Sequence, residues 1–269
     1  TVFNGVPTFY KCSQNATSLY IFDFGGAATA GSTHTISWGD ASPNYTATGT
    51  NFPQQQHSYA QGFYTLTYTI TQSNGCNDSQ QYSIFLGSNP AVGIGNPGNT
   101  NVCGPNQLVF PITGTTNNPA GTIYTVTFND GSAPVVFPHP PPASVSHLFT
   151  ISSCGTTSSN GLTNFPNSFS ATIVAENPCG LSSGSVVPIY VSTPPSTDFT
   201  VSPNDTACVN TTVTFSNTSL SGAEAPTCSG TNSTWIAATS EANQRHTATR
   251  RLSITFGSPG WRRHSIVCP

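Results

Sequence analysis

Strict alternation of apolar and polar residues is the main periodic signal along the chain. Residues 64–71 read Tyr-Thr-Leu-Thr-Tyr-Thr-Ile-Thr, and residues 124–128 and 212–215 alternate in the same way. Successive side chains of a β-strand point to opposite faces, so each stretch predicts a strand with one packed face and one solvated face. No stretch combines a helical period with capping residues. The pattern therefore predicts an all-β chain of antiparallel sandwiches.

A second pattern repeats at a longer interval. An aromatic residue that opens an Asp-containing turn is followed by a His that opens a strand, at Trp38 and His57 and again at Phe128 and His147. The two residues are 19 positions apart in each copy. A fixed interval of this kind indicates one supersecondary unit used more than once.

Clusters of Pro and small residues mark the expected boundaries between the repeated modules. They lie at Ser88-Asn89-Pro90 and at Thr193-Pro194-Pro195. Short linkers that contain Pro are semirigid, so the modules are expected to form a rod. The last strand of the second module contains Pro188, which lacks an N–H group and predicts an edge position. We predict three sandwiches, at residues 1–88, 89–194 (with an insertion) and 195–269.

Composition excludes some classes of function. Charged residues make up 6% of the chain and the net charge is −3, which does not favour capture of nucleic acid or anionic lipid. The sequence contains no run of 18 apolar residues, so it predicts no transmembrane helix.

Six of the eight cysteines lie where a predicted module opens or closes: Cys12, Cys76, Cys103, Cys179, Cys208 and Cys268. Joining the opening to the closing cysteine of each module predicts the disulfides Cys12–Cys76, Cys103–Cys179 and Cys208–Cys268. Each would contribute about 2–4 kcal/mol and would indicate an oxidising compartment outside the cell. The alternative is free buried thiols that act as small core residues. Cys154 and Cys228 are left unassigned.

These residues resemble the polycystic-kidney-disease (PKD) repeat, an immunoglobulin-like β-sandwich. Its signature of an aromatic residue, Gly-Asp-Gly, His-x-Tyr and Gly-x-Tyr is similar to Trp38-Gly39-Asp40, His57-Ser58-Tyr59 and Gly62-Phe63-Tyr64. The second module departs from it, because Asn129 replaces the first Gly and an insertion at 152–167 divides the module's end. The resemblance covers about residues 1–220. It implies tandem PKD-like sandwiches, as in large secreted or surface proteins of Bacteroidetes-like bacteria.

The end of the chain has a different composition. Five of the six basic residues follow Gln244. If the codons after Trp235 are shifted by one base, the permitted residues include Trp, Asn or Asp, a small residue, Gly and Asp. The same shift at 246–249 permits Pro-His-Ser-Tyr. These are the two signature segments that the third module lacks. We therefore hypothesise that the third module is mistranslated after about residue 235. A basic tail that binds a partner is the alternative.

Several short motifs suggest chemistry but have simpler interpretations. The Gly-x-Gly-x-x-Gly string at 93–98 lacks a following helix, and the Gly-x-Ser-x-Gly string at 180–184 joins two strands, so both are interpreted as loops. Calcium is the metal that Asp40 and Asp130 could bind, but we favour capping of their own turns. His57 and His147 are interpreted as structural hydrogen-bonding residues. We predict no catalytic, cofactor-binding or metal-binding residues.

Glycosylation is a further possibility in this Asn- and Thr-rich chain. Thr206, in Asp205-Thr206-Ala207, resembles the O-glycosylation acceptor described for Bacteroidetes. The Asn-x-Ser/Thr acceptor string begins at seven positions, Asn15, Asn44, Asn77, Asn204, Asn210, Asn217 and Asn232. Coincidence in a biased composition is the alternative.

The sequence lacks a convergent set of acid, base and nucleophile, so we predict no enzyme activity. We predict an extracellular structural or adhesive repeat protein at the cell surface, a spacer or a fibre subunit. Its expected partners are copies of itself, neighbouring repeats of a longer chain, or surface glycans. The alternative is an accessory carbohydrate- or protein-binding module of a secreted hydrolase.

Overall fold

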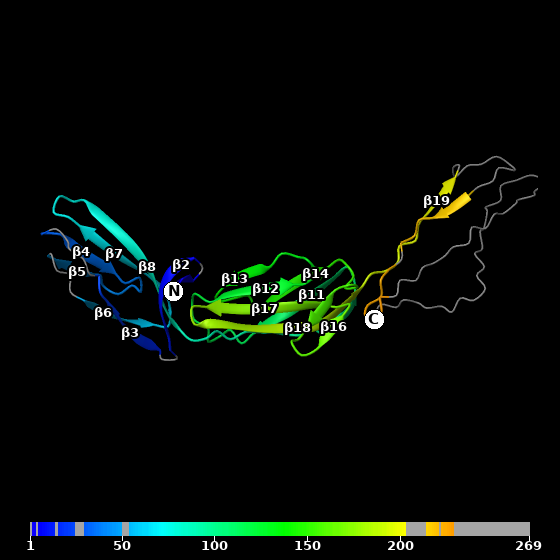
Figure 1. The fold of residues 1–269 in the computed structure, drawn as a ribbon, viewed down its shortest axis with the longest axis horizontal. Coiled ribbons are helices and arrows are strands. Elements are labelled where there is room, and N and C mark those ends of the chain that lie inside the picture. The colour runs from blue at the N-terminus through cyan, green and yellow to red at the C-terminus, as the bar shows by residue number, and fades with distance from the viewer. Residues whose placement is uncertain are drawn as a thin grey trace, which may run out of the picture. The chain divides into compact units, whose positions relative to one another are not determined.

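The computed structural model describes residues 2–3, 5–13, 16–24, 30–49, 54–202, 214–220 and 222–228. The described residues form strands, turns and loops and contain no helix, so none of them could cross a membrane as a helix. The all-β prediction, with immunoglobulin-like sandwiches in tandem, is confirmed (Figure 1).

The first sandwich pairs a six-stranded sheet, in the order β1-β2-β8-β7-β4-β5, with the two-stranded sheet β3–β6. β2 joins β8 in parallel, and the neighbouring β8–β7, β7–β4 and β4–β5 pairs are antiparallel. The predicted strand at 64–71 lies within β7. The bounds are β1 Val2–Phe3, β2 Val6–Cys12, β3 Thr17–Phe22, β4 Thr33–Ser37, β5 Tyr45–Thr48, β6 Gln55–Ala60, β7 Gly62–Thr71 and β8 Asn77–Gly87.

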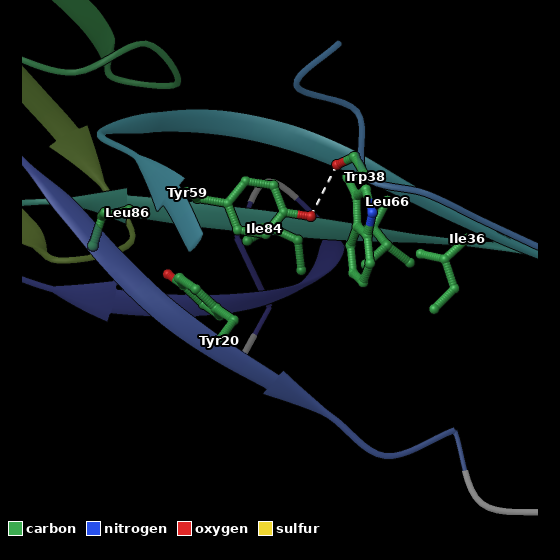
Figure 2. Close-up of a cluster of buried hydrophobic side chains, with 7 residues drawn as sticks. All are labelled: Tyr20, Ile36, Trp38, Tyr59, Leu66, Ile84 and Leu86. Carbon is green, nitrogen blue, oxygen red and sulfur yellow. Dashed lines mark hydrogen bonds between the residues drawn. The ribbon is translucent and has the colours of Figure 1, made fainter. Parts of the chain in front are cut away.

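An aromatic core fills the first sandwich. Side chains from β3, β4, β6, β7 and β8 and from the turn after β4 form it: Tyr20, Ile36, Trp38, Tyr59, Leu66, Ile84 and Leu86 (Figure 2). Two of its tyrosines satisfy their hydroxyl groups on the backbone. Tyr59 donates to the carbonyl oxygen of Trp38 at 2.9 Å, and Tyr20 donates to that of Phe85 at 2.5 Å. Burial raises the pKa of both phenols, that of Tyr20 to about 12, so each remains a neutral donor.

The second sandwich consists of a five-stranded sheet, in the order β10-β18-β17-β12-β13, and a three-stranded sheet, β14-β11-β9. The predicted strand at 124–128 lies within β12. The insertion folds as the hairpin β15–β16. The bounds are β9 Gly93–Ile94, β10 Asn101–Cys103, β11 Asn106–Thr113, β12 Ile123–Phe128, β13 Val135–Pro138, β14 Ser144–Phe149, β15 Thr157–Ser159, β16 Asn164–Pro166, β17 Phe169–Asn177 and β18 Gly180–Ser192.

The predicted edge position of Pro188 is wrong, because β18 lies between β10 and β17. β10 pairs with residues 190–192 of β18, so Pro188 precedes the paired segment. Its missing N–H therefore removes no hydrogen bond from the β10–β18 ladder.

The described residues between 193 and 223 contribute an antiparallel ribbon. β19 (Phe199–Ser202) pairs with β20 (Thr214–Asn217), and the isolated bridges Thr193–Ala223 and Ser196–Leu220 continue the same register toward the second sandwich. The predicted third sandwich remains a prediction. The segment for which we hypothesise a frame error, with its basic residues, lies outside the described residues.

The chain divides into two compact units. The first comprises Thr1–Pro97, Val109–Ser146 and Ser170–Val186, and the second comprises Gly98–Leu108, His147–Phe169 and Val187–Pro269. Four strands, β11, β14, β17 and β18, contribute residues to both.

Candidate functional site, a disulfide-locked junction

The disulfides differ from those predicted. Cys12 is bonded to Cys179, with their Cα atoms 5.5 Å apart, and Cys154 is bonded to Cys228. Cys76 is an exposed free thiol. The predicted bonds Cys12–Cys76 and Cys103–Cys179 are therefore wrong, and Cys208–Cys268 lies outside the described residues.

The direction of strand pairing explains the first correction. Because β2 is parallel to β8, Cys12 lies opposite Gly87, at the C-terminal end of β8. Cys76 immediately precedes β8, which has 11 residues and is therefore about 35 Å long. The two cysteines thus lie at opposite ends of one strand, while the disulfide-bonded sulfur of Cys179 lies 3.4 Å from the carbonyl oxygen of Gly87.

The second sandwich repeats this arrangement. β10 runs parallel to β18 and places Cys103 opposite Ser192, at the C-terminal end of β18. Cys179 immediately precedes β18, a strand of 13 residues, and is again at the opposite end. Cys103 is itself disulfide-bonded.

Two buried asparagines hold the linker between the sandwiches. Asn118 pairs with the backbone of Ala91 as a neighbouring strand would, accepting from its N–H at 2.8 Å and donating to its carbonyl at 2.7 Å. The side chain of Asn177 donates to the carbonyl of Ser88 at 3.0 Å. Together with Cys179, these contacts fix 87–91, so the linker is held along its length.

Close packing excludes side-chain atoms at two glycines of the junction. A Cβ atom on Gly87 would lie 2.6 Å from the Cγ of Pro119. A Cβ atom on Gly121, whose φ is +89°, would lie 2.9 Å from the Cβ of Phe63. These junction residues all belong to the first compact unit.

Sequence reasoning missed Asn118 and Asn177, because Asn in a loop ordinarily indicates a turn. A weak signal was present: each precedes a proline, as Asn89 in the linker does. The same dipeptide also occurs at Asn96-Pro97, so it does not single out these three loops.

In the second compact unit, the other disulfide fixes the base of the insertion. Beside Cys154, the N–H of Gly155 donates to the side-chain oxygen of Asn167 at 2.9 Å. The amide of Asn167 in turn donates to the carbonyl of Pro226 at 2.8 Å, close to Cys228. Residues 152–167 and 225–228 are thus joined both covalently and by hydrogen bonds.

Asp40, Ser42 and His57 form a polar cluster beside the core of the first sandwich. Asp40 accepts hydrogen bonds from the Ser42 backbone N–H at 3.1 Å and from its hydroxyl at 2.5 Å, and contacts His57 Nε2 at 2.7 Å. Partial burial opposes ionisation of Asp40. The bonds from Ser42 and His57 outweigh it and hold the pKa of the carboxyl below its ordinary value.

This cluster lacks the geometry of a catalytic triad. In a triad, one ring nitrogen of His faces the acid and the other faces the serine. Here Nε2 of His57 faces Asp40, and the same atom lies 3.5 Å from the Ser42 hydroxyl. His57 instead stacks on Trp38, with ring centroids 4.3 Å apart. Asp40 thus accepts the backbone N–H bond of its own turn, and His57 makes a hydrogen bond, as expected.

Other predicted residues are placed as follows. Asp130 caps its turn as expected, accepting from the backbone N–H of Ser132 at 3.1 Å and from its hydroxyl at 2.6 Å. His147 contacts the ring of Phe149. Within the described ranges, no three His, Cys, Asp or Glu residues are placed to share a metal ion. The Gly-rich string at 93–98 begins with β9, and the string at 180–184 lies in β18, without a helix.

The glycosylation predictions are untested. Asn44 and Asn77 are exposed, and Asn217 ends β20. The remaining candidates lie outside the described residues: Asn15, Asn204, Thr206, Asn210 and Asn232.

No protein-family model matches the chain, and no curated protein matches it. Similar solved structures include fibronectin(III)-like modules of Clostridium thermocellum CbhA, at 12% identity over 69% of this chain and 90% of that one, with a TM-score of 0.28. Another is the Bacteroides ovatus mixed-linkage glucan utilization locus protein SGBP-B in complex with a heptasaccharide, at 11% identity over 70% of this chain and 44% of that one, with a TM-score of 0.23. A third is a 1.5-MDa bacterial ice-binding adhesin, at 11% identity over 77% of this chain and 70% of that one, with a TM-score of 0.23. Similarity at this level carries no argument about function.

Proposed function

We propose that the chain is a load-bearing spacer segment of an extracellular protein, built from PKD-type repeats. The observation that carries the proposal is the disulfide between Cys12 and Cys179. It joins the first sandwich's β2 to the turn between β17 and β18 of the second sandwich. A bond of this kind transmits tension between modules without loading the linker.

The two disulfides overlap along the chain, and this limits how far the chain can extend. The first encloses a separation of 167 residues, and the second, with a separation of 74, begins inside it and ends beyond it. The shortest covalent route from Cys12 to Cys228 therefore runs through residues 154–179. Fully extended, that route spans about 90 Å, against about 750 Å for the chain from Cys12 to Cys228 without disulfides.

The same bonds support an extracellular location, because structural disulfides persist in oxidising surroundings outside the cytosol. Two disulfides, with a third cysteine also oxidised, indicate secretion or surface display.

An accessory sugar-binding module is less well supported. Such a module needs exposed aromatic side chains along one face. Among the described residues, Phe9, Tyr10 and Phe199 are the exposed aromatic side chains. Phe9 and Tyr10 are consecutive in β2 and therefore point to opposite faces, so they cannot form one strip.

Single-molecule pulling from the two termini tests the load-bearing role. In the oxidised chain, we expect the segment between Cys12 and Cys228 to extend to no more than about 90 Å. A reductant should increase its extended length by about 660 Å. The double variant Cys12→Ser/Cys179→Ser should release the chain length that is held by the first disulfide alone. Cys76→Ser is the matched control and should extend like the unmodified chain. Full extension of the oxidised chain would refute the proposal.

A further inference from the structure

Strands β5 and β13 occupy equivalent places in the two sandwiches. Each follows the Asp-containing turn, pairs antiparallel with the strand before that turn, and is the last strand at one side of its sheet among the described residues. Each therefore has one side without a strand partner among the described residues. Such edges are where another strand can add to a sheet.

The backbone groups that β5 presents can be assigned from the hydrogen-bond alternation. The N–H of Gly49 donates to the carbonyl of Ser32 at 3.1 Å, so the 49–32 pair is hydrogen-bonded. In an antiparallel ladder hydrogen-bonded pairs alternate, which directs Tyr45 and Ala47 toward β4. Thr46 and Thr48 then direct their N–H and C=O groups outward, and Asn44 continues the alternation.

The same reasoning shows that the outward edge of β13 is blocked against the addition of another strand. The N–H of His139 donates to the carbonyl of Thr122 at 3.0 Å, so Val135 and Phe137 are the residues that bond to β12. The outward positions are Pro134, Val136 and Pro138. Proline has no N–H, so Val136 is the one outward donor of this edge within 134–138, and a second strand finds few partners.

The outward edge of β5 has no comparable protection. Asn44, Thr46 and Thr48 are exposed and uncharged, and none of them is a proline. Tyr45 packs against the core on the other face. Natural sheets usually protect an edge with Pro, Lys or a bulge, and 44–48 contains neither residue type.

We propose that β5 pairs antiparallel with β5 of a second copy of this chain. A two-fold axis opposite Thr46 would pair Thr46 with its counterpart and Asn44 with Thr48 of the second copy, using all three outward positions. The edge is self-complementary in this arrangement, and no charge repels its counterpart. A two-fold pairing of β5 with itself uses that edge in both copies, so it closes as a dimer, and the blocked edge β13 offers few partners for further growth. The proposal does not depend on the load-bearing role.

Sedimentation of the chain without glycans tests the pairing, since Asn44 lies on the proposed interface. We expect the mass to rise with concentration toward twice the 28.0 kDa of the chain. Thr46→Pro removes an outward N–H but no bond to β4, so it should halve the mass at high concentration. Val136→Pro, the matched change on β13, should leave the dimer intact. A chain that remains monomeric, or a dimer that survives Thr46→Pro, refutes the proposal.

Cross-linking tests the register and does not require a proline variant to fold. In a Cys76→Ser background, Thr46→Cys should oxidise to a covalent dimer, because Cα atoms of a hydrogen-bonded antiparallel pair lie about 5.5 Å apart, within disulfide range. Thr48→Cys should not, because its counterpart would be four residues away along the strand, at about 13 Å. Equal cross-linking of the two variants would overturn the two-fold axis at Thr46. Both experiments are separable from pulling, which tests the disulfides within one chain.

Discussion

The turns at 38–42 and 128–132 begin as copies of one design and then differ in how they contact the neighbouring strand. In both, an aromatic residue is buried, and an Asp accepts from the backbone N–H of a Ser two residues later at 3.1 Å. The Ser hydroxyl adds a second bond, at 2.5 Å in the first turn and 2.6 Å in the second. The repeated part of the sequence thus specifies the same local hydrogen bonds twice.

The residue before the Asp makes the difference. Gly39 has a φ of +83° and approaches β7 so closely that a Cβ atom would lie 2.2 Å from the carbonyl oxygen of Thr65. Asn129 replaces this glycine, and its side-chain oxygen accepts from the backbone N–H of Ser170, in β17, at 2.6 Å. One turn docks by close backbone approach and the other by a side-chain hydrogen bond. The glycine of the motif is therefore replaceable where the new side chain supplies a bond of its own.

Gly39→Ala should produce the largest effect, a loss of about 3 kcal/mol or more, because a backbone clash adds to the cost of a positive φ. Denaturant unfolding followed by Trp38 fluorescence, in a Trp235→Phe/Trp261→Phe background, measures it. Gly75→Ala is the matched control: its φ is +87°, but no atom lies within 4 Å of the added Cβ. It should cost about 0.5–1 kcal/mol, because the lower chain entropy of Ala offsets part of the cost of the positive φ. Equal losses would show that the contact with Thr65 is unimportant.

Asp40→Asn should cost about 1–2 kcal/mol at neutral pH, because it weakens charge-assisted bonds to Ser42 and His57. The folded-state pKa of Asp40 is lowered, so its stabilisation is present above the ordinary pKa of an Asp carboxyl. It is lost as the pH falls through the lowered folded-state value. The stability difference between the parent and the variant should therefore shrink in acid, measured by the same unfolding signal. A difference that grows in acid would contradict this assignment.

Asn129→Ala should cost about 1 kcal/mol, the usual value of one lost hydrogen bond. It leaves the turn bond from Asp130 to Ser132 in place, so the effect should be confined to the contact with β17. Hydrogen exchange followed on peptides that cover 128–132 and 169–177 measures the change. Faster exchange throughout the first sandwich as well would indicate a global effect and contradict a local docking role.

The local features followed from sequence because their causes are local. Alternation placed strands at 64–71 and 124–128, and the Asp-x-Ser spacing supports the turn caps. Disulfide pairing could not be obtained this way, because Cys12 and Cys76 are separated by the direction in which β2 pairs with β8. That direction depends on the whole sheet, so the spacing of cysteines within a module cannot predict it.

The junction was unpredictable for a related reason. Asn118 and Asn177 act through backbone groups of the linker, 27 and 89 residues away in sequence. An asparagine that bonds to a distant linker has the same local sequence as one that forms a turn. Glycines such as Gly121 likewise indicate a turn, while the close approach of Phe63 appears once the modules are folded.

The smallest expected effects come from exchanging the residue after the Asp. Ala41 has a φ of 65° and Gly131 a φ of +90°, with no atom within 4 Å of a Cβ placed on Gly131. Ala41→Gly should stabilise the first turn, because glycine tolerates this conformation, although its greater chain entropy limits the gain to about 0.5–1 kcal/mol. Gly131→Ala should destabilise the second turn by about the same amount. Fluorescence-detected unfolding reports the first change and hydrogen exchange across β12–β13 the second. Effects of the same sign would mean that the two turns differ in more than the residue before the Asp, and that their shared hydrogen bonds do not impose one backbone conformation.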